Sequence, residues 1–101
     1  MSIGDFFGRE GISVALSTTS SDTGSDGLDV YGNYNISLFG TWAGTVHLQR
    51  SFDSEVSWVD IDSFVANVEL VGLQPENGVV TRLFVKAGNY TSGTIEGRLS
   101  Q

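Results

Sequence analysis

The residues of this chain that could perform acid–base chemistry are few and lie in one stretch of the sequence. His47 is the only histidine, and two carboxylate pairs follow it, Asp53 with Glu55 and Asp60 with Asp62. A glycosidase needs two carboxylates, and a spacing of two residues places both on one face of a strand. A catalytic histidine needs a second group to orient it, and no motif near His47 supplies one. We therefore expect an exposed strand histidine and surface carboxylates beside turns.

Other catalytic patterns are missing from the sequence. It contains no glycine-rich phosphate loop after a strand, no G-x-S-x-G nucleophile elbow and no paired-histidine metal motif. It also has no cysteine, so it can form neither a thiolate metal site nor a disulfide framework. The sequence therefore predicts a protein that is not an enzyme and has no catalytic, cofactor-binding or metal-binding residues.

One polar loop has a composition that allows two interpretations, a calcium site or an ordinary surface turn. Residues 18–27 read TTSSDTGSDG, and Asp22, Asp26 and Asp29 lie close together in the sequence there. Oxygen-rich loops can hold calcium, but this spacing does not match the twelve-residue helix–loop–helix pattern. Asp, Ser and Gly also make up ordinary surface turns, which is the simpler interpretation.

The stretch that organises the chain is residues 40–62, GTWAGTVHLQRSFDSEVSWVDID. Apolar residues recur at period two on both sides of Ser54 and Glu55, which predicts a β-hairpin. The alternating residues are Val46, Leu48 and Phe52 before the turn, and Val56, Trp58 and Ile61 after it.

The turn of this hairpin has the residue order of an Asp-box, S-x-D-x-G-x-T-W. Ser51, Asp53 and Trp58 match the pattern, while Glu55 stands in place of Gly and Ser57 in place of Thr. In this motif the Asp bonds nearby backbone N–H groups and the Trp packs beneath the turn. We therefore expect Ser51, Asp53 and Trp58 to be structural, with Trp58 in the core.

The rest of the chain shows the same period. Thirteen glycines and one proline separate short alternating segments, and no segment has a helical period. The 101 residues suffice for one modest core. We predict an all-β fold, a single antiparallel β-sandwich of about seven or eight strands over residues 11–101, either immunoglobulin-like or jelly-roll.

Residues 1–10 are expected to form an N-terminal arm. Ile3, Phe6 and Phe7 lie among glycines, a pattern too short for a stable helix. They could cover an open end of the domain's own core, or dock on a neighbouring chain as an assembly contact. Trp42, between Gly40 and Gly44, could likewise plug an end of the sandwich or anchor a partner.

The charge and the hydropathy limit the partners. Twelve acidic and five basic residues give a net charge of −7, which repels phosphate backbones, so we expect no nucleic-acid partner. No apolar run is long enough to cross a membrane, and the first residues do not resemble a signal peptide. We therefore expect synthesis in the cytoplasm and no membrane partner.

Parts of the last two-thirds of the chain resemble small β-rich proteins from the structural gene clusters of tailed bacteriophages. The segments that carry the resemblance are 40–46 (GTWAGTV), 48–53 (LQRSFD) with Trp58, 85–94 (VKAGNYTSGT) and 98–101 (RLSQ). In that group the hairpin turn is often a fuller Asp-box with Gly, from which Ser54-Glu55-Val56 departs.

The resemblance implies a virion component synthesised in the host cytoplasm. It favours a head decoration (cement) protein that binds the major capsid protein or other virion proteins and forms a homo-oligomer. The alternative within the same kind of particle is a head–tail connector or tail subunit. A different class is a carbohydrate-binding module, in which Trp42, Tyr31, Tyr34 and Tyr90 would form a stacking platform on one exposed face.

Overall fold

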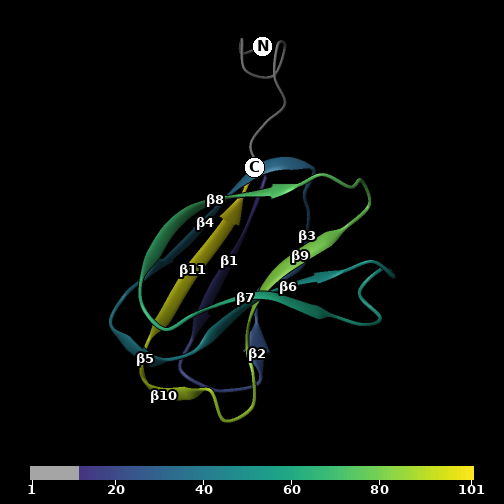
Figure 1. The fold of residues 1–101 in the computed structure, drawn as a ribbon. Coiled ribbons are helices and arrows are strands. Elements are labelled where there is room, and N and C mark those ends of the chain that lie inside the picture. The colour runs from purple at the N-terminus through teal and green to yellow at the C-terminus, as the bar shows by residue number, and fades with distance from the viewer. Residues whose placement is uncertain (1–11) are drawn as a thin grey trace.

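The computed structural model describes residues 12–101, which form eleven antiparallel strands and no helix (Figure 1). The predicted arm, with Ile3, Phe6 and Phe7, lies outside the described residues. The strands are β1 (Ser13–Thr18), β2 (Thr23–Gly24), β3 (Leu28–Asp29), β4 (Gly32–Phe39), β5 (Trp42–Gly44), β6 (Val46–Ser51), β7 (Val59–Phe64), β8 (Val68–Gln74), β9 (Val80–Val85), β10 (Tyr90–Gly93) and β11 (Ile95–Ser100). The all-β prediction is confirmed. The count exceeds eight because short strands such as β2 and β3 lie in stretches expected to be loops or parts of longer strands.

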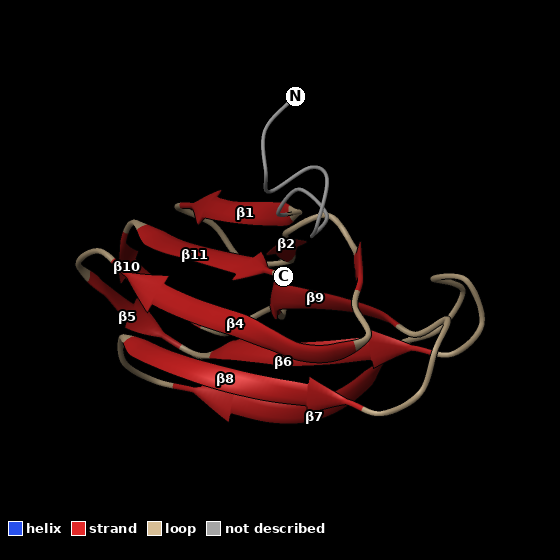
Figure 2. Cartoon of the chain, turned by 90° about the horizontal axis from the view of Figure 1, so that it is seen from above, coloured by secondary structure: helices blue, strands red, loops and turns tan. Residues whose placement is uncertain are grey.

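Two larger sheets contain most of the strands. One has the order β1-β11-β4-β8, and the other has the order β2-β9-β6-β7, with β3 also paired to β9. Figure 2 shows them as two layers, and β8 and β7 are the last strands of the two sheets on one side, as β1 and β2 are on the other. A third, two-stranded sheet pairs β5 with β10.

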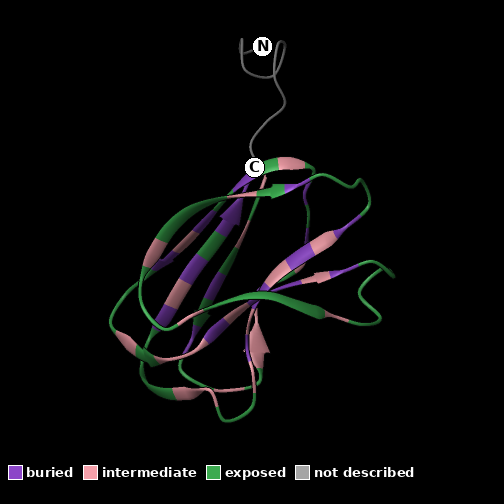
Figure 3. Ribbon diagram, in the orientation of Figure 1, coloured by how far each residue is buried: buried purple, intermediate pink, exposed green. Residues whose placement is uncertain are grey.

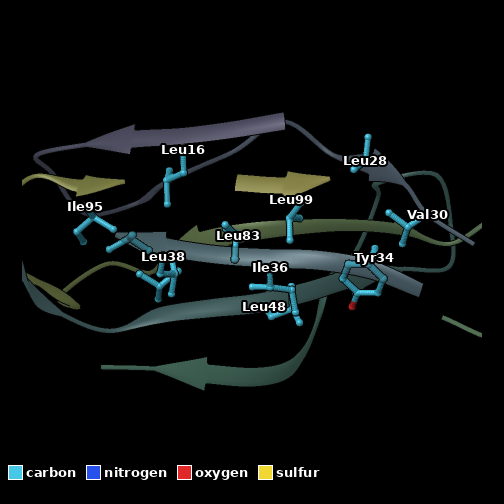
Figure 4. Close-up of a cluster of buried hydrophobic side chains, with 12 residues drawn as sticks. Leu16, Leu28, Val30, Tyr34, Ile36, Leu38, Leu48, Leu83, Ile95 and Leu99 are labelled. Atoms are coloured by element: carbon cyan, nitrogen blue, oxygen red, sulfur yellow. The ribbon is translucent and has the colours of Figure 1, made fainter. Parts of the chain in front are cut away.

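The hydrophobic core lies between the two larger sheets (Figure 4). On β4 the alternation places Tyr34, Ile36 and Leu38 in the core, as the period-two pattern predicts, and on β9 it places Leu83 and Val85 there. The remaining buried members are Leu16, Leu28, Val30, Val46, Leu48, Ile95 and Leu99. Each sheet therefore contributes one apolar face to a shared core.

Strand β8 contains a glycine in its interior. β7 ends at Phe64, β8 begins at Val68, and Gly72 lies inside β8. A Cβ atom at residue 72 would lie 2.6 Å from Cζ of Tyr34, so this glycine makes room for the tyrosine ring.

The hairpin of β6 and β7 is present, but its connection is longer than predicted. Phe52 and Val56 are exposed loop residues, and the second strand begins at Val59 instead of Val56. Ser54 and Glu55 have left-handed backbone conformations, with φ of 57° and 70°. Side-chain hydrogen bonds from the turn replace the strand ladder here, which explains why alternation alone misplaced the boundary.

Candidate functional site

Two of the acid–base candidates, His47 and Asp60, belong to a network on the outer face of the second sheet. His47 Nε2 lies 3.0 Å from Asn89 Oδ1, and His47 Nδ1 lies 3.9 Å from Asp60 Oδ2. Asp60 also accepts a hydrogen bond of 2.8 Å from Gln49 Nε2 and forms an ion pair with Lys86. These hydrogen bonds, first that from Lys86 and then that from Gln49, lower the pKa of Asp60. The carboxylate is thus held ionised by neighbours within the chain.

The predicted carboxylate pair Asp60 and Asp62 does not share a strand face. A register shift in the pairing of β6 with β7 places Asp60 opposite Gln49 and Asp62 opposite Leu48, which points into the core. Directly opposed residues in an antiparallel pair lie on the same side of the sheet. The bulge therefore places the two carboxylates on opposite faces of the sheet. The expectation that they share one face, as a glycosidase pair would, is wrong.

The other carboxylate candidate, Asp53, organises the β6–β7 turn. Its Oδ1 accepts hydrogen bonds from Ser51 Oγ at 2.7 Å and from the Ser57 backbone N–H at 2.9 Å. Its Oδ2 accepts a further hydrogen bond of 2.5 Å from Ser57 Oγ. The two Ser57 bonds, followed by that from Ser51, lower the pKa of Asp53 to about 2. Asp53 thus ties down the turn through a backbone N–H, as the sequence predicts.

Trp58 lies on this outer face and not in the core, which corrects the expectation from the hairpin pattern. It is partly exposed, and Cζ of Arg82 lies 3.9 Å from the centroid of its ring and 4.2 Å from that of Phe84. Arg82 Nε donates a hydrogen bond of 2.8 Å to Gln49 Oε1. Burial lowers the pKa of Arg82, with the charge of Glu55 acting in the opposite direction. The guanidinium therefore makes cation–π contacts with two aromatic rings.

The proposed aromatic platform does not form. Tyr34 is buried in the core, whereas Tyr31 is exposed. Trp42 and Tyr90 pack partly against the core, with the indole N–H of Trp42 bonded to Asn67 Oδ1 at 2.7 Å. The four rings do not share one exposed face, and the contacts of Trp42 fit its role as a plug.

The aspartates of the polar loop do not gather into a metal site. Within residues 12–101 no three His, Asp or Glu side chains are placed to hold a metal ion together, and this includes Asp22, Asp26 and Asp29. Asp22 has a left-handed backbone conformation, with φ of 56°. This fits the turn interpretation, because aspartate tolerates that conformation better than most residues.

A surface that sequence reasoning missed lies where β7 and β8 form neighbouring edges of the two sheets. Val68 and Leu70 pair with the buried Leu38 and Ile36 and so face the other sheet, yet 43% of Leu70 is exposed. Val59 of β7 faces inward in the same way, and 50% of it is exposed. Figure 3 shows β7 and most of β8 as exposed, apart from their ends and a few partly buried positions. We call this surface the β7–β8 opening, defined by Val59, Asp62, Phe64, Val68 and Leu70.

Two buried polar atoms without a hydrogen-bond partner lie one and two strands in from the β7 edge. Arg50 of β6 pairs with both Val59 and Thr81, so all three side chains face the space between the sheets. The Nε atom of Arg50 and the hydroxyl of Thr81 are the buried side-chain atoms among the described residues that lack a partner. Such atoms destabilise a fold until an acceptor or donor reaches them.

A concavity lies on the outer face of the four-stranded sheet. It has a volume of about 290 Å³ and is lined by residues that include Asn35, Ser37, Glu69, Val71 and Arg98. Ser37 Oγ donates a hydrogen bond of 2.8 Å to Glu69 Oε1. The groove is mostly polar, in contrast to the apolar β7–β8 opening.

The part of the chain that the structure describes contains no helix of the length and apolarity that would span a membrane. Comparison with protein-family models, with curated proteins and with solved structures finds no match to this chain. The surfaces described above and the resemblance of the sequence are therefore the basis on which a function can be proposed.

Proposed function

We propose that this chain is a non-enzymatic structural protein of a tailed bacteriophage particle, most specifically a decoration protein that binds the assembled head. The observation that carries the proposal is the β7–β8 opening. Leu70 and Val59 are directed at the other sheet and yet remain in water. Exposed apolar surface of this kind is unfavourable in a free subunit and is removed from water by assembly.

The arrangement of the polar groups supports a structural role. The carboxylates that could act as acids or bases, Asp53 and Asp60, are each held by several hydrogen bonds from their own chain. Their lowered pKa values keep them ionised at neutral pH, where a general acid would need a raised value. These groups stabilise a turn and a sheet face.

We further propose that the two larger sheets form a β-sandwich of the immunoglobulin-like or jelly-roll type, and that the β6–β7 turn is a variant Asp-box. The left-handed conformation of Glu55, at the position where the pattern has Gly, supports the second point, because glycine adopts that conformation freely. The hydrogen bonds of Asp53 to Ser51 and Ser57 support it as well.

A binding experiment with phage heads tests the function. Purified protein is incubated with empty heads of the phage that encodes it and with heads of an unrelated phage as a control, and the bound protein is measured after sedimentation. A decoration protein should bind its own heads in many copies per particle. Binding in only a few copies would indicate a connector or tail subunit, and failure to bind any particle of that phage would contradict the proposal.

A further inference from the structure

We propose that the β7–β8 opening receives the N-terminal arm of a second copy of this chain, so that subunits associate head to tail. This inference goes beyond binding to the head, since it assigns a contact between copies. It rests on the position of the opening, on the reach of residues 1–10 from their point of attachment, and on the charge distribution along the chain.

The opening and the root of the arm lie at opposite edges of the four-stranded sheet. The order β1-β11-β4-β8 places β1, which follows the arm, three strands away from β8. Paired residues Ser13, Ser100, Asn35 and Val71 form one row across these four strands. The β1 edge, at which the described residues begin, is therefore at the opposite side of the sheet from the β7–β8 opening (Figure 2).

The reach of the arm disfavours docking within one chain. Strands are about 4.8 Å apart, so a segment beside β8 lies about 19 Å from β1 in a straight line through the sheet. Phe7 precedes Ile12 by five residues, which span at most about 17 Å when fully extended. The route around the sheet is longer than the straight line. Docking of Phe7 in the opening of a neighbouring copy is therefore favoured over docking in its own chain.

The N-terminal arm of a second copy suits this site better than the described domain of that copy does. Of the net charge of −7, residues 1–11 contribute only −1, through Asp5, Glu10 and Arg9. Two described domains would therefore repel each other, whereas the arm brings little charge. At period two, Ile3 and Phe7 flank Asp5 on one face of an extended segment. Such a segment offers apolar groups to Leu70 and Val59 and a carboxylate to Arg50, whose Nε is buried without a partner.

A contact between two different surfaces has a geometric consequence. Each subunit would donate an arm at its β1 edge and accept one at its β7–β8 edge. Heterologous contacts of this kind close into rings when the rotation between subunits allows it and otherwise extend into filaments. The smallest unit that can show the contact is one donor chain with one acceptor chain.

Complementation between two disabled chains tests the proposal. In the donor-deficient chain Ile3→Ser and Phe7→Ser remove the two apolar groups that the arm would present on one face. In the acceptor-deficient chain Leu70→Glu places a charge in the opening. The matched control is Val71→Glu on the same strand, whose side chain is exposed on the opposite face. Association of each full chain is measured by analytical ultracentrifugation, and its thermal midpoint reports whether the domain remains folded.

The unaltered chain and the Val71→Glu control should self-associate as the concentration rises. Each disabled chain should remain folded and show an association constant lower by about 30-fold or more, the effect of losing an interface hot spot. An equal mixture of the two disabled chains should form a complex of two subunits and nothing larger. An unaltered chain that is monomeric at about 100 μM would overturn the proposal, as would a mixture that fails to pair. Head binding without self-association would separate this failure from that of the proposed function.

Discussion

The two edges of the same pair of sheets differ in how far they exclude water. At the β1–β2 edge, Leu16 faces the core and is only 3% exposed, while at the β7–β8 edge Leu70 faces inward in the same way and is 43% exposed. The two residues are of one type, and both lie in alternating strands. The difference shows that the exposure of a strand residue depends on its neighbours in the other sheet as much as on its own hydropathy.

Polar groups follow the same division. At the closed edge, the hydroxyl of Thr18 is buried and donates to the Ser20 carbonyl at 3.2 Å, within a short turn that leads from β1 to β2. One strand in from the open edge, Nε of Arg50 in β6 is buried and lacks a partner. The buried hydroxyl of Thr18 at the closed edge is thus satisfied within the chain, whereas the buried Nε of Arg50 next to the open edge is not.

Truncating the matched leucines should give the largest difference between the edges. Leu16→Ala removes a fully packed side chain and should lower the free energy of unfolding by about 2–5 kcal/mol. Leu70→Ala removes a side chain already partly in water and should cost about 1 kcal/mol or less. Urea unfolding of dilute protein measures both. Equal losses would show that the opening is packed as tightly as the closed edge.

A second pair of variants compares the buried hydroxyls. Thr81→Val removes a buried polar atom without a partner and should raise the free energy of unfolding by about 1 kcal/mol. Thr18→Val removes a hydroxyl that is bonded and should lower it by a similar amount. The thermal midpoint and the free energy of unfolding in urea should rise for Thr81→Val and fall for Thr18→Val. A loss of stability in Thr81→Val would mean that its hydroxyl is satisfied in solution.

The loops at the two edges differ in backbone strain. Glu55, in the β6–β7 turn, has φ of 70°, and Asp22, in the β1–β2 turn, has φ of 56°. Glu55→Gly should raise the free energy of unfolding by about 0.5–1 kcal/mol, because glutamate disfavours the left-handed region. Asp22→Gly should gain less, since aspartate tolerates this conformation. The thermal midpoints of the two variants decide the order, and a larger gain at residue 22 would contradict it.

The smallest effect concerns acid. The hydrogen bonds of Asp53 lower its pKa from the ordinary 3.8 to about 2 in the folded protein. The folded state therefore binds a proton less readily than the unfolded state, and the stabilisation is fully present above pH 3.8 and lost as the pH falls toward 2. Asp53→Asn should lower the thermal midpoint at neutral pH and reduce its change over this acidic range. An unaltered slope in the variant would place the acid sensitivity elsewhere, with Asp60 the next group to test.

The sequence by itself determined the class of the fold and much of its core. Period-two alternation located the inward faces of β1, β4 and β9, because a strand buries every second side chain whatever lies opposite. The turn chemistry of Asp53 was also readable, since its hydrogen bonds join residues within a few positions of one another. Local patterns of this kind depend only on neighbours along the chain.

The tertiary structure alone decided which strands lie at an edge and what each outward side chain meets. Trp58 lies over Arg82 and outside the core because the strand that follows begins at Val59, after a turn longer than the pattern predicted. Asp60 and Asp62 lie on opposite faces because a bulge shifts the pairing of β6 with β7. Strands β1 and β8 both end the order β1-β11-β4-β8, and what each meets in the other sheet decides that Leu16 is buried while Leu70 remains partly in water. Strand order results from contacts between distant segments, and alternation along a single strand carries no information about it.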